Sequence, residues 1–187
     1  MDMRFASHRI ISIGIITLAA FWLGGPAMVC GQEKSGEPAK AGEPAKTGSK
    51  ADPRVEKALA AMGYKYDVTE LGNCRVLFEL EGGRGHLVFI SSAVEKFGVT
   101  ETRKVWATVM KSKTPLSQEL ANQLLMDNIA LKQGAYELTK MDDGGYKVQF
   151  TCKVDANCSF AKLKDSIQFV KIIADAKEKE LTGADEF

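Results

Sequence analysis

The sequence contains few of the residues that build catalytic and metal centres. Of its 187 residues only two are histidines and four are cysteines, and no two cysteines have the C-x-x-C spacing of zinc and thioredoxin-type sites. A metal site needs several converging ligands, and His86 is the only histidine that remains once the N-terminus is removed. Ser91 and Ser92 lack a G-x-S-x-G context. We therefore predict no catalytic residue, no metal and no cofactor, in a protein that is not an enzyme.

An excess of charge of either sign is also missing. The chain has 25 basic and 24 acidic residues, which gives a formal net charge of +1. Proteins that bind nucleic acid need a clearly basic face, because contacts with phosphates supply much of their affinity. The composition therefore predicts that nucleic acid is not a partner.

The N-terminus has the pattern of a targeting segment. Arg4 and Arg9 precede an apolar run over residues 10–23, and small residues follow near Cys30. We predict that residues 1–31 are a signal peptide and that the protein is exported to the periplasm or the extracellular space. The run is shorter than the ~20 residues of a spanning helix. An uncleaved anchor and a lipid-modified Cys30 are the two alternatives, and only these would place the protein at a membrane.

A low-complexity stretch separates this segment from the rest of the chain. The sequence GEPAK occurs twice within residues 32–52, and its Pro, Gly, Ala and mixed charge cannot bury a core. We predict that residues 32–52 are a disordered linker, that residues 53–182 form one domain, and that residues 183–187 are a tail.

Periodic patterns in the domain predict alternating helices and hairpins. Apolar stripes of helical spacing occur in three segments. The first follows Asp52, the second is expected to end at Gly134, and the third begins at Phe160. The last stripe places Lys177 on the solvent-exposed side of its helix. Alternating residues predict strands at 66–80, 86–91, 100–110, 136–139 and 146–154. The predicted fold is α+β, with a mainly antiparallel five-stranded sheet and the order α-β-β-β-α-β-β-α.

One segment carries a resemblance to a known family. The sequence QLLMDNIALKQGAYELTKMDDGGYKVQFTCKVD, followed by a long amphipathic helix, resembles the YbjN-like family of bacterial domains. The matching features are Leu124 and Leu125, Asn128, Gly134 and the aromatic Tyr136. That family is similar in fold to the class I type III secretion chaperones. The resemblance implies a binding domain and a homodimer, but those chaperones act in the cytosol, so only fold and binding mode carry over to an exported chain.

These observations together favour a binding function. We expect an exported, non-catalytic module that binds a protein or peptide segment, in a chaperone-like or regulatory role, through a sheet edge or an apolar helix face. The candidate binding surface consists of Trp106, Met110, Leu116 and Met126, unless each simply completes the monomer core. The alternative is a small-ligand receptor or an enzyme whose site forms only in the fold, and a deep polar pocket around His86 would favour it.

Three cysteines remain after removal of the signal peptide, namely Cys74, Cys152 and Cys158. An odd number leaves at least one thiol unpaired within the monomer. A disulfide between Cys152 and Cys158 would cross the loop between the last strand and the last helix. The alternative is that all three are small buried apolar residues.

Overall fold

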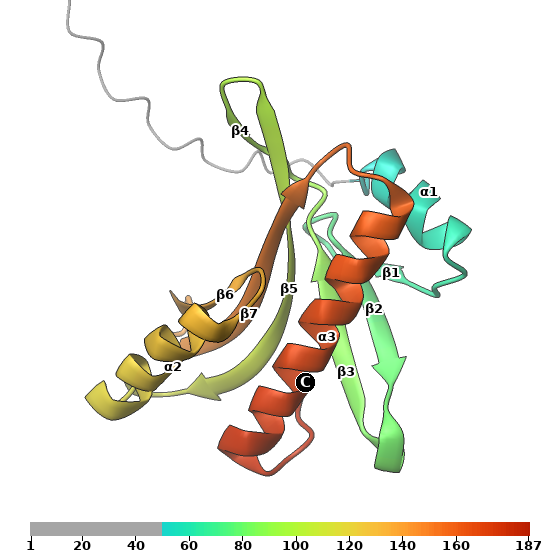
Figure 1. Ribbon diagram of the computed structural model, residues 1–187. Coiled ribbons are helices and arrows are strands. Elements are labelled where there is room, and N and C mark those ends of the chain that lie inside the picture. The colour runs from blue at the N-terminus through green and yellow to red at the C-terminus, as the bar shows by residue number, and fades with distance from the viewer. Residues whose placement is uncertain (1–49) are drawn as a thin grey trace, which may run out of the picture. The chain divides into compact units, whose positions relative to one another are not determined.

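The computed structural model describes residues 50–187. Within this range the chain forms three α-helices, one 3₁₀ turn and seven strands (Figure 1). The elements in chain order are α1 (Pro53–Ala61), β1 (Asp67–Val68), β2 (Cys74–Glu79), η1 (Glu81–Gly83), β3 (Gly85–Ile90), β4 (Glu95–Phe97), β5 (Thr100–Ser112), α2 (Gln118–Ala130), β6 (Ala135–Lys140), β7 (Tyr146–Asp155) and α3 (Phe160–Thr182). None of the helices in residues 50–187 combines the length and apolar content needed to cross a bilayer.

The α+β class is confirmed, and the sheet is antiparallel with the strand order β1-β2-β3-β5-β7-β6. Its seven strands exceed the predicted five, because β1 and β4 have only two and three residues, too few to produce a visible alternation. The predicted strand over residues 66–80 is divided by a turn in which Gly72 has a φ of 76°. β4 forms a hairpin with the start of β5 around Gly98.

The core lies between the sheet and α3, which crosses one face of it (Figure 1). The predicted stripe of α3 is buried at Leu163, Ile167, Val170 and Ala174. Alternate residues of each strand point toward this helix, as the pleat of a strand requires. The largest fully buried apolar side chains are those of Val55, Leu59, Val88, Ile90, Val105, Val109, Val148, Phe150, Ile167 and Val170.

The prediction that Lys177 lies on the solvent-exposed side of α3 is wrong, because its side chain is buried between α3 and α2. Its ammonium group lies 2.9 Å from a carboxylate oxygen of Asp127 on α2 and 2.7 Å from one of Glu180. Its Nζ also lies 5.7 Å from the centre of the Tyr136 ring. The long apolar stem covers core surface while the charge finds partners, so a lysine is accommodated in an apolar stripe.

The folded unit extends beyond residues 53–182 at both ends. Ala51 is buried in the core and the carboxylate of Asp52 caps α1. Residues 184–187, predicted as a tail, lie against β3, where the backbone N–H of Leu87 donates to the backbone oxygen of Phe187. The predicted signal peptide and nearly all of the predicted linker lie outside the residues that the structure describes.

Gly134 does not end α2, contrary to the sequence prediction, since the helix already ends at Ala130. Gly134 instead starts the β6–β7 hairpin with a φ of 76°. Asn128 connects the two elements, because its side-chain oxygen accepts a hydrogen bond of 2.8 Å from the backbone N–H of Tyr136. The two family-like positions Asn128 and Tyr136 therefore fix the path from helix to strand.

Replacement of Leu124 by alanine should lower the free energy of unfolding by about 2–5 kcal/mol, because its side chain is buried in the core. Leu125 is the matched control, since it lies on the same helix but is 65% exposed. Its replacement by alanine should cost less than about 1 kcal/mol. Urea unfolding of both variants measures the difference, and equal losses would contradict this orientation of α2.

Candidate functional site

The four residues predicted to form a binding surface do not lie together. Met110 and Leu116 pack against the core. Met126 is exposed on the outer side of α2. Trp106 alternates with the buried Val105 and so lies on the face of the sheet opposite α3. The structure therefore divides the predicted patch between the core and two separate surfaces.

Trp106 lies at the centre of the sheet face opposite α3, which we call the open face. Its ring stacks on Phe89 of β3, with centroids 5.5 Å apart and planes inclined by 15°. A cavity of about 320 Å³ opens here. It is lined by Ser91, Ala93, Glu95, Lys104, Trp106, Glu137, Thr139, Lys147, Gln149 and Thr151. Leu77 of β2 adds an exposed apolar side chain on the same face.

Paired charges surround this aromatic centre. Lys104 lies 3.2 Å from Glu137, whose carboxylate also accepts a hydrogen bond from the Thr151 hydroxyl. Lys153 lies 2.7 Å from Glu95, and this pair lowers the pKa of the Glu95 carboxyl. An aromatic platform with acceptors and donors around it can hold a polypeptide segment, which presents both apolar side chains and backbone polar groups.

A second cavity, of about 250 Å³, lies beside the start of α3 and includes Cys158 in its lining. All three cysteines in residues 50–187 are free thiols, so the disulfide between Cys152 and Cys158 is not formed. Cys152 points into the core, and the strand carries the chain about 10 Å further before the loop with Cys158 begins. Burial raises the pKa of Cys74 and Cys152 to about 11, so both thiols stay protonated. For these two the alternative prediction, small buried residues, is confirmed.

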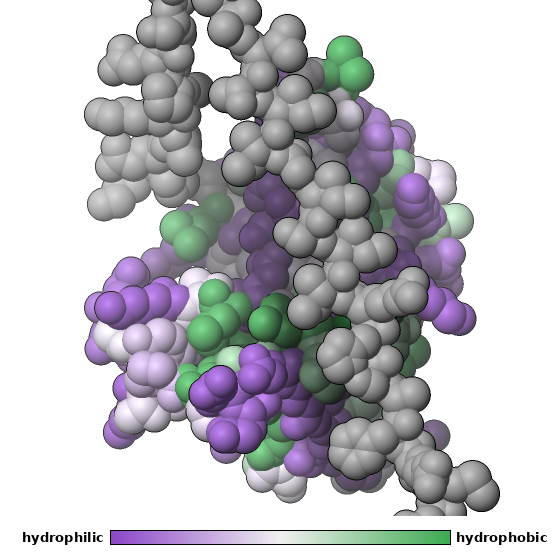
Figure 2. Space-filling model, turned by 60° about the vertical axis from the view of Figure 1, so that its left-hand side comes forward, coloured by the Kyte–Doolittle hydropathy of each residue, from purple (hydrophilic) through white to green (hydrophobic). Residues whose placement is uncertain are grey.

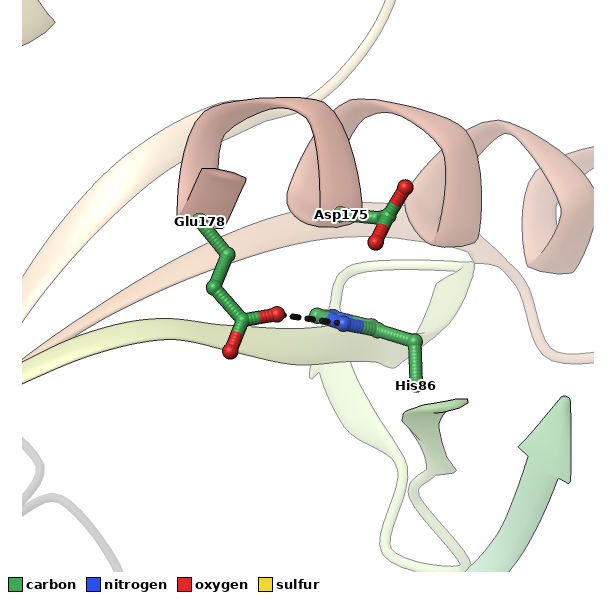
Figure 3. A group of neighbouring side chains, drawn as sticks. All are labelled: His86, Asp175 and Glu178. Atoms are coloured by element: carbon green, nitrogen blue, oxygen red, sulfur yellow. Dashed lines mark hydrogen bonds and ion pairs between the residues drawn. The ribbon is translucent and has the colours of Figure 1, made fainter. Parts of the chain in front are cut away.

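His86 belongs to a buried ionic cluster between β3 and α3 (Figure 3). Its Nδ1 lies 3.1 Å from Oε2 of Glu178, and both side chains are fully buried. Its Nε2 has no hydrogen-bond partner within residues 50–187. His86 lines neither of the cavities above, and its side chain is fully buried.

Arg84 supplies the positive charge of this cluster. Its guanidinium lies 2.9 Å from Asp175 and 3.4 Å from Glu178. The second oxygen of Glu178 accepts a hydrogen bond of 2.7 Å from the backbone N–H of Glu186. His86, Asp175 and Glu178 have the chemistry of metal ligands and lie within 4.8 Å of one another. Because Arg84 already contacts both carboxylates, the arrangement fits an internal ion network better than a metal site.

Burial lowers the pKa of His86, because an imidazolium would lose its hydration and its Nε2–H would have no acceptor. Arg84 acts in the same direction, whereas the carboxylates of Glu178 and Asp175 oppose it. The neutral ring therefore donates from Nδ1 to Glu178 in the folded protein.

Stability should accordingly decrease as the pH falls below about 6.5, the pKa of histidine in an unfolded chain. The unfolded chain then binds a proton more readily than the folded one, at up to about 1.4 kcal/mol per pH unit. Urea unfolding at about pH 7.5 and about pH 5.5 measures the change. The His86→Gln variant should lose less stability between the two pH values, and an unchanged difference would contradict the lowered pKa.

Comparison with solved structures shows a distant similarity in fold. No protein-family model matches the chain, and no curated protein matches it either. Among solved structures, the fold is similar to that of YbjN from E. coli, described as a proposed transcription regulator. The TM-score is 0.44 at 11% sequence identity, over 67% of this chain and 88% of that one. YbjN bears the name of the family that residues 123–155 resemble, and the similarity concerns the fold alone.

Proposed function

We propose that the protein is an exported, non-catalytic module that binds a protein or peptide segment, in a chaperone-like or regulatory role. The open face carries the proposal, because it places the half-buried Trp106 in a cavity that no other part of residues 50–187 fills. The proposal that the protein is exported rests on the N-terminal pattern of residues 1–31. The proposal that it is not an enzyme rests on the sequence and on the buried position of His86.

The chemistry of the open face suits an extended segment better than a small charged ligand. Trp106 and Phe89 offer stacked aromatic area, which is the kind of anchor that dominates binding energy at interfaces. The surrounding ion pairs, Lys104 with Glu137 and Lys153 with Glu95, contain both signs of charge. Such pairs give orientation and specificity rather than a strong preference for anions or cations.

Substitution of Trp106 tests this function. Immobilised wild-type protein should retain a partner from an extract of the envelope fraction, identified by mass spectrometry. Trp106→Ala should lose that partner, whereas Ile172→Ala, which changes an exposed residue of α3 on the other side of the sheet, should retain it. Thermal unfolding of both variants controls for folding. A partner that both variants retain equally would contradict binding at the open face.

We further propose that the module is a homodimer that uses the exposed side of α2. Leu125, Met126 and Ile129 are 65%, 66% and 86% exposed, and Leu138 on the neighbouring strand β6 is 51% exposed. Figure 2, in which the side of α2 and β6 comes forward, shows apolar side chains gathered on this face among charged ones. β6 is an edge strand of the sheet. An unpaired strand edge beside apolar surface favours association of two copies of the protein.

Light scattering tests the dimer. Wild-type protein at micromolar concentration should show twice the monomer mass. Ile129→Glu should give a monomer with unchanged thermal stability, because the side chain does not contribute to the core. A wild-type monomer would remove the dimer from the proposal and leave the open face unaffected.

A further inference from the structure

β3 pairs with β2 along its whole length but with β5 along only part of it. It pairs with β5 only through residues 88–90, which lie opposite residues 105–107. The earlier part of β3 and the later part of β5 diverge, as Figure 1 shows. The edge of β3 formed by residues 84–87, which we call the β3 edge site, is thus free of β5.

Residues 184–187 of the same chain occupy the β3 edge site. The backbone N–H of Leu87 donates to the backbone oxygen of Phe187 over 3.1 Å. The backbone N–H of Gly85 donates to the carboxylate of Asp185, also over 3.1 Å. The guanidinium of Arg84 donates to the carbonyl of Ala184 over 2.8 Å. Without this segment the N–H groups of Gly85 and Leu87 would lie on an unpaired sheet edge, which readily accepts an added strand.

Two side chains of this segment, those of Asp185 and Phe187, contact basic residues. The carboxylate of Asp185 lies 3.8 Å from the guanidinium of Arg84. The ring of Phe187 lies under the ammonium group of Lys111 on β5, 4.9 Å from its centre. A cation above an aromatic face is attractive, and this contact connects the segment to both strands. The β3 edge site therefore recognises an acidic residue and, two positions later, an aromatic one.

We propose that the β3 edge site binds extended segments of the pattern Asp-x-Phe from a partner protein, and that residues 184–187 occupy it in cis. The main-chain contacts can be made by any extended chain, while Arg84 and Lys111 select the two side chains. Gly183, with a φ of 64°, ends α3 and separates the segment from the helix. This site uses none of the residues of the open face, so the proposal goes beyond the function proposed above.

Peptide binding to the full chain tests the proposal. The probe is a fluorescein-labelled peptide with the sequence of residues 179–187, KELTGADEF, followed by anisotropy. The wild-type protein should bind it weakly, because its own segment competes. The variant Asp185→Asn with Phe187→Ala should bind it about tenfold more tightly, as expected when an occupied site becomes free. A peptide with the same two changes should bind that variant about tenfold more weakly than the probe does.

Two results in this assay would overturn the proposal. One is a double variant that binds the probe no more tightly than the wild type does. The other is equal binding of the probe and the changed peptide. The single variant Asp185→Asn repeats the comparison if the double variant unfolds. Trp106→Ala should bind the probe as the wild type does, which separates this site from the open face.

Hydrogen exchange at the amide of Leu87 follows occupancy of the site directly. This amide should exchange slowly in the wild type, faster in the double variant, and slowly again in the double variant with the probe peptide. Unchanged exchange in the double variant would overturn the proposal. If the double variant, and not Ile129→Glu, converts a dimer to a monomer, the site binds a second copy of the chain. That result would overturn the proposal that it binds a partner protein.

Discussion

Replacement of Gly134 by alanine should destabilise the protein by about 2–5 kcal/mol, the sum of backbone strain and overpacking. The φ of 76° is unfavourable for a residue with a side chain. An added Cβ would also lie 2.6 Å from the carbonyl oxygen of Thr151, 2.7 Å from Sγ of Cys152 and 2.9 Å from the ring of Phe150. The backbone of β7 cannot move aside without disturbing its pairing with β5.

Gly144 is the matched control for this prediction. It has a φ of 85°, and nothing lies within 4 Å of an added Cβ. Its replacement by alanine should therefore cost only the backbone term, about 1–2 kcal/mol. Urea unfolding of both variants measures the difference. Equal losses would show that the close approach of Gly134 to β7 does not determine stability.

Replacement of Asp52 by alanine should destabilise the protein by about 3–5 kcal/mol, because it leaves the buried Arg103 without its charge partner. The two side chains meet at 2.9 Å, and Arg103 is almost fully enclosed. Its other hydrogen bonds go to the carbonyls of Ser91 and Ala156, which do not neutralise it. The same carboxylate also caps α1 by accepting from the N–H of Arg54.

Asp67→Ala is the control for this prediction, because Asp67 pairs with Arg75 at 3.4 Å while 74% of its side chain is exposed. Its loss should cost less than about 1 kcal/mol. The hydrogen bond from Arg54, together with that from Arg103, holds the pKa of Asp52 far below its usual range despite partial burial. The stability that Asp52 contributes should therefore be present above about pH 4 and decrease as the pH falls further. A loss at Asp52 as small as that at Asp67 would contradict the buried pair.

The sequence predicts those parts of the fold in which a periodic pattern is long enough to be read. The stripe of α3 and the alternation of β7 extend over many residues, and both elements lie where they were predicted. β1 and β4 are set by pairing with neighbouring strands, so their own sequences carry little signal. Arg103 shares the inward phase of Val105 and Ala107, and this phase could have indicated a buried charge.

The candidate sites could be predicted only in part. Trp106 was among the predicted surface residues, but Met110 and Leu116 pack against the core. Glu178 continues the stripe of α3 one turn beyond Ala174, so its burial follows from helical spacing. Its pairing with His86, 92 residues earlier, depends on the tertiary fold.

The most direct test of the central claim uses Trp106 itself as the reporter. Trp22→Phe leaves Trp106 as the only tryptophan, so the emission of this full-length variant reports on the open face. Titration with the partner retained by the wild-type protein should shift that emission to shorter wavelength and saturate at the stoichiometry found by calorimetry. Binding that is seen by calorimetry but leaves the emission of Trp106 unchanged would contradict a module that binds its partner through the open face.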